Sequence, residues 1–361
     1  MKYVDEFRDK KLIDKLAREI RESVDLGRIY RFMEVCGTHT MAIFRFGLKN
    51  ILPANIELIS GPGCPVCVTP NGYIDEAISL AAMKDVVIAT FGDMLRVPGS
   101  HSSLEKERAR GAAVKIVYST MDAVALAKKN PEKEVIFLGI GFETTIPTVA
   151  QSIIAAKRGN IHNYSVLCGH KTMPQILRAL VADRDLNIDG FLLPGHVSAV
   201  IGVRPYGFIP DRYGIRCVVA GFEPVDIMQA LLMLVRQDRP RVEIQYTRII
   251  RKGGNTLAED SITEVFKRSA SVWRGIGEVK KSGLAIKDRY SDFDAARKFD
   301  IKKGRSKENK RCICGDVLKG SKTPLDCSLF AKACNPEYPV GACMVSSEGT
   351  CAAYYRYGER S

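Results

Sequence analysis

The chain has 361 residues, of which 46% are hydrophobic and 26% are charged, and this composition is typical of a globular protein with two or three domains. Its 54 lysine and arginine residues exceed the 41 acidic residues and give a formal net charge of +13. A basic balance can indicate nucleic acid, anionic ligands or an acidic protein partner, but no nucleic-acid-binding motif accompanies it here. We therefore expect a solvated basic surface and no nucleic-acid partner.

The N-terminal segment is predicted to form an amphipathic helix, because apolar residues recur at helical spacing among many charges. These residues are Leu12, Leu16, Ile20 and Val24. The first twenty residues lack the apolar core of a signal peptide, and no apolar run approaches the length of a bilayer span. A cytoplasmic protein without membrane contact is expected. In that reducing compartment, eleven cysteines indicate metal binding or redox chemistry more than structural disulfides.

From residue 31 to residue 220 the chain repeats one pattern, in which a short apolar run precedes a glycine-containing polar motif and, usually, a helical stretch. Seven runs show it, at residues 31–35, 56–59, 86–90, 135–138, 165–167, 191–193 and 218–220. Strands that alternate with helices in this way form mostly parallel sheets. The predicted fold class is α/β, with two parallel-sheet domains facing a cleft. Ligands should bind where the polar motifs lie, at the carboxyl ends of the strands.

Three domains are expected. The first α/β domain, with the N-terminal helix, should cover residues 1–140, and the second, with a connecting segment, residues 141–300. The Asn130–Pro131 break and the Gly159–Asn160 turn are the candidate joins between the sheets. Residues 301–361 should form a small iron–sulfur domain, which begins with a basic, apolar-poor linker from Lys302 to Arg311.

Six of the eleven cysteines lie in residues 312–351, here called the C-terminal module. They are Cys312, Cys314, Cys327, Cys334, Cys343 and Cys351. A segment with so few large apolar side chains needs a metal centre to stabilise it. Four thiolates suffice for a 4Fe–4S cluster or for zinc, but the module lacks the C-x-x-C pairs of a zinc ribbon, and six cysteines are two more than one zinc ion needs. A cluster together with a dithiol fits better, although spacing alone does not decide which four cysteines bind it.

Two further motifs with cysteine follow predicted strands. Cys64 and Cys67 form a C-x-x-C motif, whose spacing permits a disulfide. Half of a zinc site is the alternative, but no second C-x-x-C motif completes it, so a redox dithiol is favoured. Cys36 and His39 lie three residues apart, and this pair is compatible with a nucleophile and its base, with an iron-binding thiolate beside a donor, or with a structural role. At a strand end, Cys36 should be a partly exposed thiolate of lowered pKa.

The remaining candidates are weaker. Polar residues in similar strand-end loops are more often hydrogen-bonded loop residues than ligands, and here they are Asp93, Glu143, His170 and His196. Cys168 and Cys217 lie in strand-like apolar runs and are expected to be buried thiols that behave as small apolar residues. Nucleotide binding is not supported, because the glycine-rich phosphate-binding fingerprints are incomplete.

Taken together, five motifs resemble those of the HypD family of hydrogenase maturation proteins, over nearly the whole chain. The motifs are Cys36-Gly-Thr-His-Thr, Gly61-Pro-Gly-Cys-Pro-Val-Cys, Gly141-Phe-Glu-Thr-Thr, Pro194-Gly-His-Val and Ser346-Ser-Glu-Gly. The resemblance implies two α/β domains facing a cleft and a smaller iron–sulfur domain. It also implies a role in making the Fe(CN)2CO group of nickel–iron hydrogenases, bound to the small chaperone HypC and receiving cyanide from HypE. A redox-active assembly scaffold, monomeric within that hetero-complex, describes this role better than a stand-alone enzyme.

The same resemblance implies roles for individual cysteines. Cys36 would bind the iron of the Fe(CN)2CO group, shared with a cysteine of HypC, with His39 beside it. Cys64 and Cys67 would be a redox dithiol in the cleft. The C-terminal module is similar to ferredoxin–thioredoxin reductase, in which cluster ligands and a redox disulfide interleave. On that pattern the disulfide would join Cys314 and Cys343, and the 4Fe–4S ligands would be Cys312, Cys327, Cys334 and Cys351.

Two other functions use parts of the same residue set. A cluster-dependent thiol–disulfide reductase acting on another protein would use the cluster and both dithiols but gives Cys36 no role. A zinc-stapled RNA-binding protein would use the basic linker. The source of the carbon monoxide, the electron donor to the cluster and the order of ligand loading have no signature in the sequence.

Overall fold

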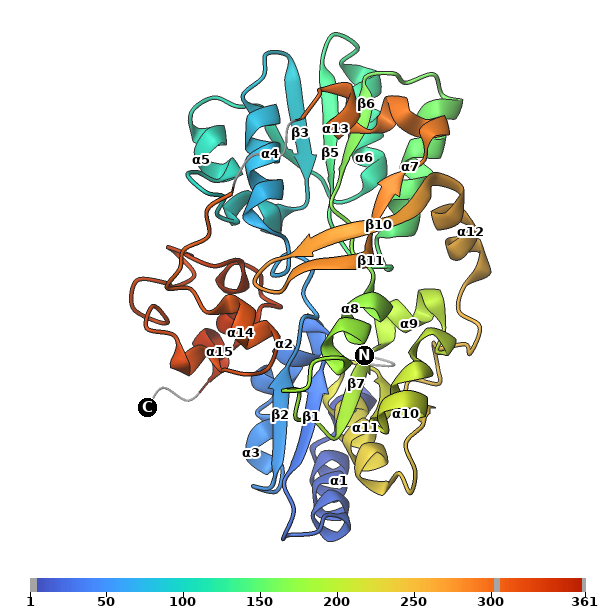
Figure 1. Cartoon of the computed structure of the whole chain (residues 1–361), viewed down its shortest axis with the longest axis vertical. Helices are drawn as coiled ribbons and strands as arrows, with labels where there is room; N and C mark the ends of the chain where they lie inside the picture. Colours follow the sequence, from blue (N-terminus) through green and yellow to red (C-terminus); the bar gives the residue numbers. More distant parts are fainter. Residues whose placement is uncertain (1–4, 302–305, 359–361) are drawn as a thin grey trace.

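The computed structural model describes residues 5–301 and 306–358, and two parallel sheets form its framework, one in the upper and one in the lower half of Figure 1. A two-stranded hairpin lies between them, and the C-terminal module packs at the side of their junction. The predicted α/β class, with two parallel-sheet units and a cysteine-rich C-terminal part, is confirmed. In the described ranges, no helix combines the length and the apolar character needed to cross a membrane.

The first unit contains five parallel strands in the order β2–β1–β7–β8–β9. In chain order these strands are β1 (Tyr30–Glu34), β2 (Ile56–Ser60), β7 (Gly190–Pro194), β8 (Arg216–Ala220) and β9 (Val242–Ile244). Its helices are α1 (Lys10–Ser23), α2 (Gly37–Arg45), α3 (Leu48–Ile51), α8 (Met173–Val181), α9 (Gly195–Ile201), α10 (Phe208–Tyr213) and α11 (Pro224–Arg236). The predicted N-terminal amphipathic helix is α1, which contacts α11 and buries Leu16 and Ile20.

The second unit contains four parallel strands in the order β4–β3–β5–β6. These strands are β3 (Val86–Thr90), β4 (Val114–Ile116), β5 (Glu134–Gly139) and β6 (Tyr164–Cys168). The helices around them are α4 (Asn71–Ala81), α5 (Leu104–Ala109), α6 (Thr120–Lys129), α7 (Ile146–Arg158) and α13 (Ala295–Lys298). All seven strands expected from the apolar runs are confirmed, whereas β4 and β9 are missed because Lys115 and Glu243 interrupt their apolar sequence.

The chain passes between the two units more than once. β1 and β2 belong to the first unit, β3 to β6 to the second, and β7 to β9 to the first again. The expected boundary between residues 140 and 141 therefore separates β5 from β6, although these two strands are paired in one sheet. Each unit is thus assembled from segments that are not consecutive.

The two turns proposed as joins lie inside the second unit. Asn130 ends α6 and Gly159 ends α7, and both helices cover the same sheet. The first two crossings instead fall between β2 and β3 and between β6 and β7, so the Asn130–Pro131 and Gly159–Asn160 joins are wrong. Turn residues mark the ends of helices but carry no information about which sheet the next strand joins.

Alternate residues of the buried strands face opposite cores, as the pleat of a strand requires. In β1, Phe32 belongs to the core beneath α1 and α11, whereas Met33 belongs to the core at the junction of the units. In β5, Phe137 belongs to the core beneath α6 and α7, whereas Ile136 faces the junction. The two units thus face each other across a junction that is filled by one continuous apolar core.

A hairpin, a set of short helices and the C-terminal module complete the structure. Helix α12 (Thr256–Val265) leads into the antiparallel strands β10 (Phe266–Trp273) and β11 (Gly277–Ile286). The module contains α14 (Cys314–Leu318) and the first two residues of α15 (Thr350–Tyr357), a helix that packs against α2. The 3-10 helices are Asp5–Arg8, Gly92–Arg96, Arg204–Tyr206, Asp288–Phe293, Pro324–Asp326 and Ala342–Met344.

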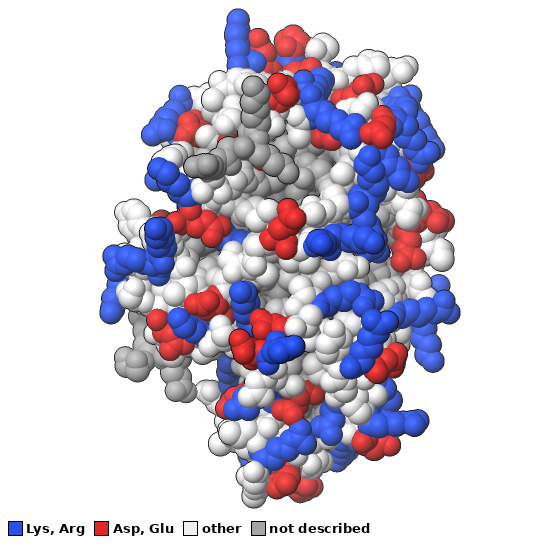
Figure 2. Space-filling model, viewed as in Figure 1, with Lys and Arg blue, Asp and Glu red and all other residues white. Residues whose placement is uncertain are grey.

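The basic linker is only partly within the described residues, because positions 302–305 lie outside them. Its described end is held by backbone hydrogen bonds: the N–H of Lys307 donates to Ser100 Oγ (2.7 Å) and its carbonyl accepts from Asn71 Nδ2 (2.8 Å). On the face drawn in Figure 2, basic and acidic side chains are interspersed. This distribution agrees with a solvated surface.

Candidate redox and metal-binding site

Cys36 lies at the carboxyl end of β1, where it is the residue that precedes α2. The backbone N–H groups of Thr38 and His39, in the first turn of that helix, favour the charged form of the Cys36 sulfur. The thiol is only 8% exposed, and burial, together with the nearby Glu348 carboxylate, raises the pKa of Cys36 to about 11. The expectation of a partly exposed thiolate with a lowered pKa is therefore wrong. Desolvation of the charged form outweighs the helix N-terminus, and a bound metal cation would reverse this balance.

The imidazole of His39 contacts the end of β8. Its Nε2 lies 2.9 Å from the carbonyl oxygen of Gly221, and its ring stacks on Phe222 with centroids 5.0 Å apart. Burial lowers the pKa of His39 to about 4, so the ring is neutral at physiological pH. His196 stacks on the same phenylalanine at 3.8 Å. Both histidines thus surround Phe222, and among the described residues Nδ1 of His39 has no hydrogen-bond partner.

Residues 346–348 of the C-terminal module reach both α/β units. Thr38 Oγ1 donates to Glu348 Oε1 (2.6 Å), and Ser346 Oγ donates to Asp93 Oδ2 (2.9 Å). A Cβ atom on Gly37 would lie 2.6 Å from Glu348 Cβ, which shows how closely this segment covers the residue after Cys36. The sequence marks Ser346-Ser-Glu-Gly as a motif but assigns Glu348 and Thr38 no role. Their contact joins residues far apart in the chain, which spacing does not reveal.

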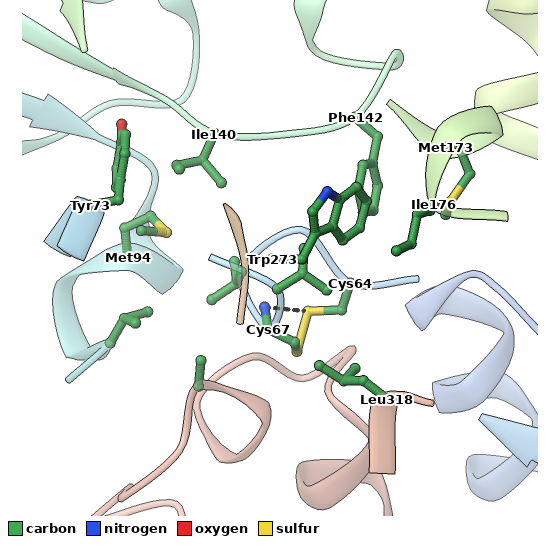
Figure 3. Close-up of a cluster of buried hydrophobic side chains, with 14 of the residues drawn as sticks. Cys64, Cys67, Tyr73, Met94, Ile140, Phe142, Met173, Ile176, Trp273 and Leu318 are labelled. Atoms are coloured by element: carbon green, nitrogen blue, oxygen red, sulfur yellow. Dashed lines mark hydrogen bonds between the residues drawn. A yellow bond between two sulfur atoms is a disulfide. The ribbon is translucent and has the colours of Figure 1, made fainter. Parts of the chain in front are cut away.

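Cys64 and Cys67 come together as the C-x-x-C spacing predicts. Their Cα atoms are 5.3 Å apart, within the range of a disulfide, and the N–H of Cys67 donates to Cys64 Sγ (3.2 Å). Both are buried, and Figure 3 shows them beside Trp273 of the hairpin and Leu318 of the C-terminal module. The loop that carries them touches Cys36, because a Cβ on Gly63 would lie only 2.2 Å from the Cys36 nitrogen.

The six cysteines of the C-terminal module line a single small cavity with apolar walls. The lining residues include Val317, Leu329 and Met344 between the thiols Cys312, Cys314, Cys327, Cys334, Cys343 and Cys351. Cys312 and Cys334 each interact electrostatically with Cys351, and Cys334 also interacts with Cys327. In the described ranges, no three His, Cys, Asp or Glu side chains are grouped so as to hold a single metal ion. Several thiols that line one apolar cavity fit a multinuclear cluster with thiolate ligands.

The other two thiols of the module form a close pair. Cys314 Sγ and Cys343 Sγ are 2.9 Å apart, and Cys314 and Cys351 both raise the pKa of Cys343. The hydrogen bond from Cys343 lowers the pKa of Cys314, and the buried Arg274 adds to this effect. Within the pair, Cys314 is thus the thiol that ionises more readily. The structure brings these two cysteines together as expected and connects them to one of the four expected cluster ligands.

The weaker candidates occupy hydrogen-bonded loops. Both carboxylate oxygens of Glu143 accept from the N–H of Met173 (3.0 and 3.2 Å), and His170 Nδ1 lies 3.5 Å from Cys168 Sγ. Cys217 is fully buried, as expected, whereas Cys168 is half-buried. In the described structure, these residues have structural roles at the ends of the strands.

Glu143 should make the stability of the protein depend on pH. Burial raises its pKa to about 7, so the stability that the neutral carboxyl contributes is complete below its unfolded pKa and is lost as pH rises through 7. Glu143→Gln should therefore be more stable than the wild type at pH 8, by about 2 kcal/mol, with little difference at pH 4.5. Thermal unfolding at several pH values measures this. Exposed Glu132→Gln is the control, and a pH-independent difference for Glu143→Gln would contradict the interpretation.

The fold and these thiols define an α/β protein whose cysteines gather at the junction of two parallel-sheet units and in a C-terminal module. Comparison with known proteins assigns this chain to a family. The family model described as "HypD: Hydrogenase formation hypA family" matches residues 11–358. The chain belongs to the HypD family.

Curated relatives match over nearly the whole chain. The hydrogenase maturation factor HypD2 of Bradyrhizobium diazoefficiens is 48% identical, over 99% of this chain and 97% of its own. HypD of Azotobacter vinelandii is 49% identical, over 100% and 98%, and HypD of Escherichia coli is 46% identical, over 100% and 99%. This extent includes both α/β units and the C-terminal module.

Proposed function

We propose that this protein acts in hydrogenase maturation, as a redox-active scaffold in the cytoplasm on which the Fe(CN)2CO group is assembled with partners of the HypC and HypE type. One observation supports this most strongly. The backbone of the C-x-x-C loop contacts the backbone of Cys36. The dithiol and the candidate iron-binding thiol are therefore neighbours, and all three cysteines are buried. Within that buried junction, an iron intermediate would be separated from bulk water.

The C-terminal module would supply the electrons for this chemistry. Cys312, Cys327, Cys334 and Cys351 would hold a 4Fe–4S cluster, which provides electrons one at a time when bound. Cys343 interacts both with Cys314, the other member of the close pair, and with the expected ligand Cys351. Reduction of a disulfide breaks the sulfur–sulfur bond and takes up two electrons and two protons. A dithiol beside the cluster would therefore collect two single electrons for a two-electron step.

Partner binding is expected to involve the segment around Glu348. Cys36 is covered by this segment, so sharing iron with a cysteine of a HypC-type partner requires that Glu348 moves away from Thr38. Removal of this carboxylate from the thiol would also remove the repulsion that opposes ionisation of Cys36. The resulting complex would contain one copy of this chain with its partners.

The second candidate function is a cluster-dependent thiol–disulfide reductase that acts on another protein. The close Cys314–Cys343 pair is compatible with it. Both dithiols are buried, however, and a disulfide of another protein would need to reach one of them. Infrared spectroscopy and iron analysis of the complex, purified without oxygen, separate the two functions. Cyanide and carbonyl bands with iron beyond that of the cluster support the scaffold, and their absence supports the reductase.

The two kinds of cysteine in the C-terminal module should respond differently to substitution. Cys314→Ala is expected to keep the full iron content, because Cys314 is paired with Cys343 and is not an expected ligand. The same variant should fail to pass electrons from the reduced cluster to the Cys64–Cys67 disulfide. Iron per chain and alkylation of Cys64 and Cys67 after reduction of the cluster measure both effects. Cys168→Ala is the control, and loss of iron in Cys314→Ala would contradict the assignment.

A further inference from the structure

The turn of the β10–β11 hairpin is attached to the C-x-x-C loop. The backbone N–H of Arg274 donates to the carbonyl of Val68 (2.9 Å), and its side-chain Nε donates to the carbonyl of Thr69 (2.7 Å). These two acceptors directly follow Cys67. Two hydrogen bonds from a single residue thus fix the end of the loop that carries the dithiol.

The same turn is packed against the C-terminal module. A Cβ on Gly275, which has a φ of +68°, would lie 2.2 Å from the Cα of Gly315. Gly315 follows Cys314, so the hairpin turn touches the chain beside both thiol pairs. Backbone packing this close needs glycine on both sides. The turn therefore contacts both the C-x-x-C loop and the first helix of the module.

Arg274 brings a buried positive charge to this connection. Its side chain is 5% exposed, and its hydrogen bonds go to backbone carbonyls, including a weaker one to Pro98 (3.5 Å). Among the described residues, no ion pair includes Arg274. A guanidinium stays charged at all physiological pH values, and a buried charge without an acidic partner favours any nearby group that becomes anionic.

We propose that Arg274 is a positioning residue for the Cys64–Cys67 pair: it holds the C-x-x-C loop against the C-terminal module and favours the reduced state of the pair. This inference rests on the redox role proposed above. In the reaction, the Cys64–Cys67 bond breaks, and two electrons and two protons give two thiols. The guanidinium is held at the carbonyl of Thr69, two residues after Cys67, so its positive charge favours a thiolate formed from either cysteine and leaves the neutral disulfide unaffected. Removal of the charge should therefore shift the equilibrium toward the disulfide.

The experiment measures this equilibrium in the full-length protein with its cluster. Wild type, Arg274→Gln and Arg274→Lys are equilibrated without oxygen in buffers of reduced and oxidised dithiothreitol, which supplies or accepts the two electrons and two protons. The samples are quenched with acid and alkylated, and mass spectrometry of the peptide that contains Cys64 and Cys67 gives the reduced fraction. Arg268→Gln is the matched control, since Arg268 is an exposed arginine of the same hairpin.

Arg274→Gln is expected to shift the thiol–disulfide equilibrium at least tenfold toward the disulfide, which corresponds to about 30 mV for this two-electron couple. Arg274→Lys keeps the charge but cannot reproduce the guanidinium geometry, so it should shift the equilibrium about threefold. Arg268→Gln should stay within twofold of the wild type. Partial rescue by lysine is the result that a purely structural arginine would not give.

An equilibrium for Arg274→Gln within twofold of the wild type, with iron content unchanged, would overturn the proposal. If Arg274→Gln does not fold, Arg274→Lys decides: a shift of about threefold supports the proposal, and no shift overturns it. A wild-type pair that never forms a disulfide in these buffers would instead refute the redox role itself, and this inference with it. Failure of the Arg274 proposal and failure of the redox role are distinguishable, because only failure of the redox role changes the result for the wild type.

Discussion

Replacing Cys36 with serine should give a protein that folds, keeps the cluster of the C-terminal module and still binds a HypC-type partner, but carries no cyanide-bearing iron. A hydroxyl is a poorer ligand than a thiolate for iron that carries cyanide and carbon monoxide. The side chains have nearly the same shape, so the packing around Gly63 and Glu348 should change little. Infrared spectroscopy of the purified complex, with an iron count above that of the cluster, measures the effect.

Two comparisons make this result specific. Cys168→Ser is the control, because Cys168 is also at a strand end but lies in the second unit, where it hydrogen-bonds to the carbonyl of Leu284. Cys64→Ser should differ from Cys36→Ser, because loss of a redox thiol blocks ligand loading and need not block iron binding. Cyanide and carbonyl bands at full strength in Cys36→Ser would show that the iron is bound elsewhere, and the scaffold mechanism would be wrong.

Cys327→Ala should lose the cluster and unfold the C-terminal module while both sheets remain folded. Among the described residues, the separate apolar core of this module is small: its buried members are Leu329, Cys334 and Met344. Such a core cannot offset the conformational entropy of about forty ordered residues without a metal centre. We expect iron to fall to background and amide exchange to rise sharply across residues 312–351, with exchange in β1 and β5 unchanged.

A buried cysteine outside the module provides the control for this variant. Cys217→Ala removes a thiol from the core of the first unit and should leave the iron content as it is. Wild-type levels of iron and of cluster absorbance in Cys327→Ala would remove Cys327 from the set of ligands. Loss of iron without a change in amide exchange would show that the module folds by itself.

Local patterns in the sequence predict most of the fold elements correctly. Apolar runs of three to five residues before glycine motifs identify seven strands, because buried parallel strands need continuous apolar sequence. The hairpin is not predicted, since its strands are largely exposed and Lys267, Arg268 and Lys280 interrupt the apolar pattern. Strand order is also beyond this kind of reasoning. The sequence of a buried parallel strand does not indicate which strands pair with it. The pairing of β7 with β1 therefore has no local signal in the sequence.

The candidate site is predictable in its residue types and not in its environment. Spacing is enough to pair Cys64 with Cys67, because three residues place two thiols within reach. Glu348 covers the residue after Cys36 and raises the pKa of its thiol, and a strand-end motif cannot anticipate a contact from more than three hundred residues away. Arg274 is missed for a similar reason, since its contacts with Val68 and Thr69 come from tertiary packing alone.

The order of strands also constrains how the protein is made. During synthesis, the four strands of the second sheet have all left the ribosome once Cys168 is free, whereas the first sheet still lacks β7, β8 and β9. Until Gly190 and the residues after it appear, β1 has β2 on one side and no neighbour on the other. The second sheet can therefore complete its pairing while the nascent chain is still growing, and the first sheet, which carries Cys36, is the later one to close. Because Glu348 covers the residue after Cys36, the thiol expected to receive iron reaches its buried position only after residue 348 has been translated.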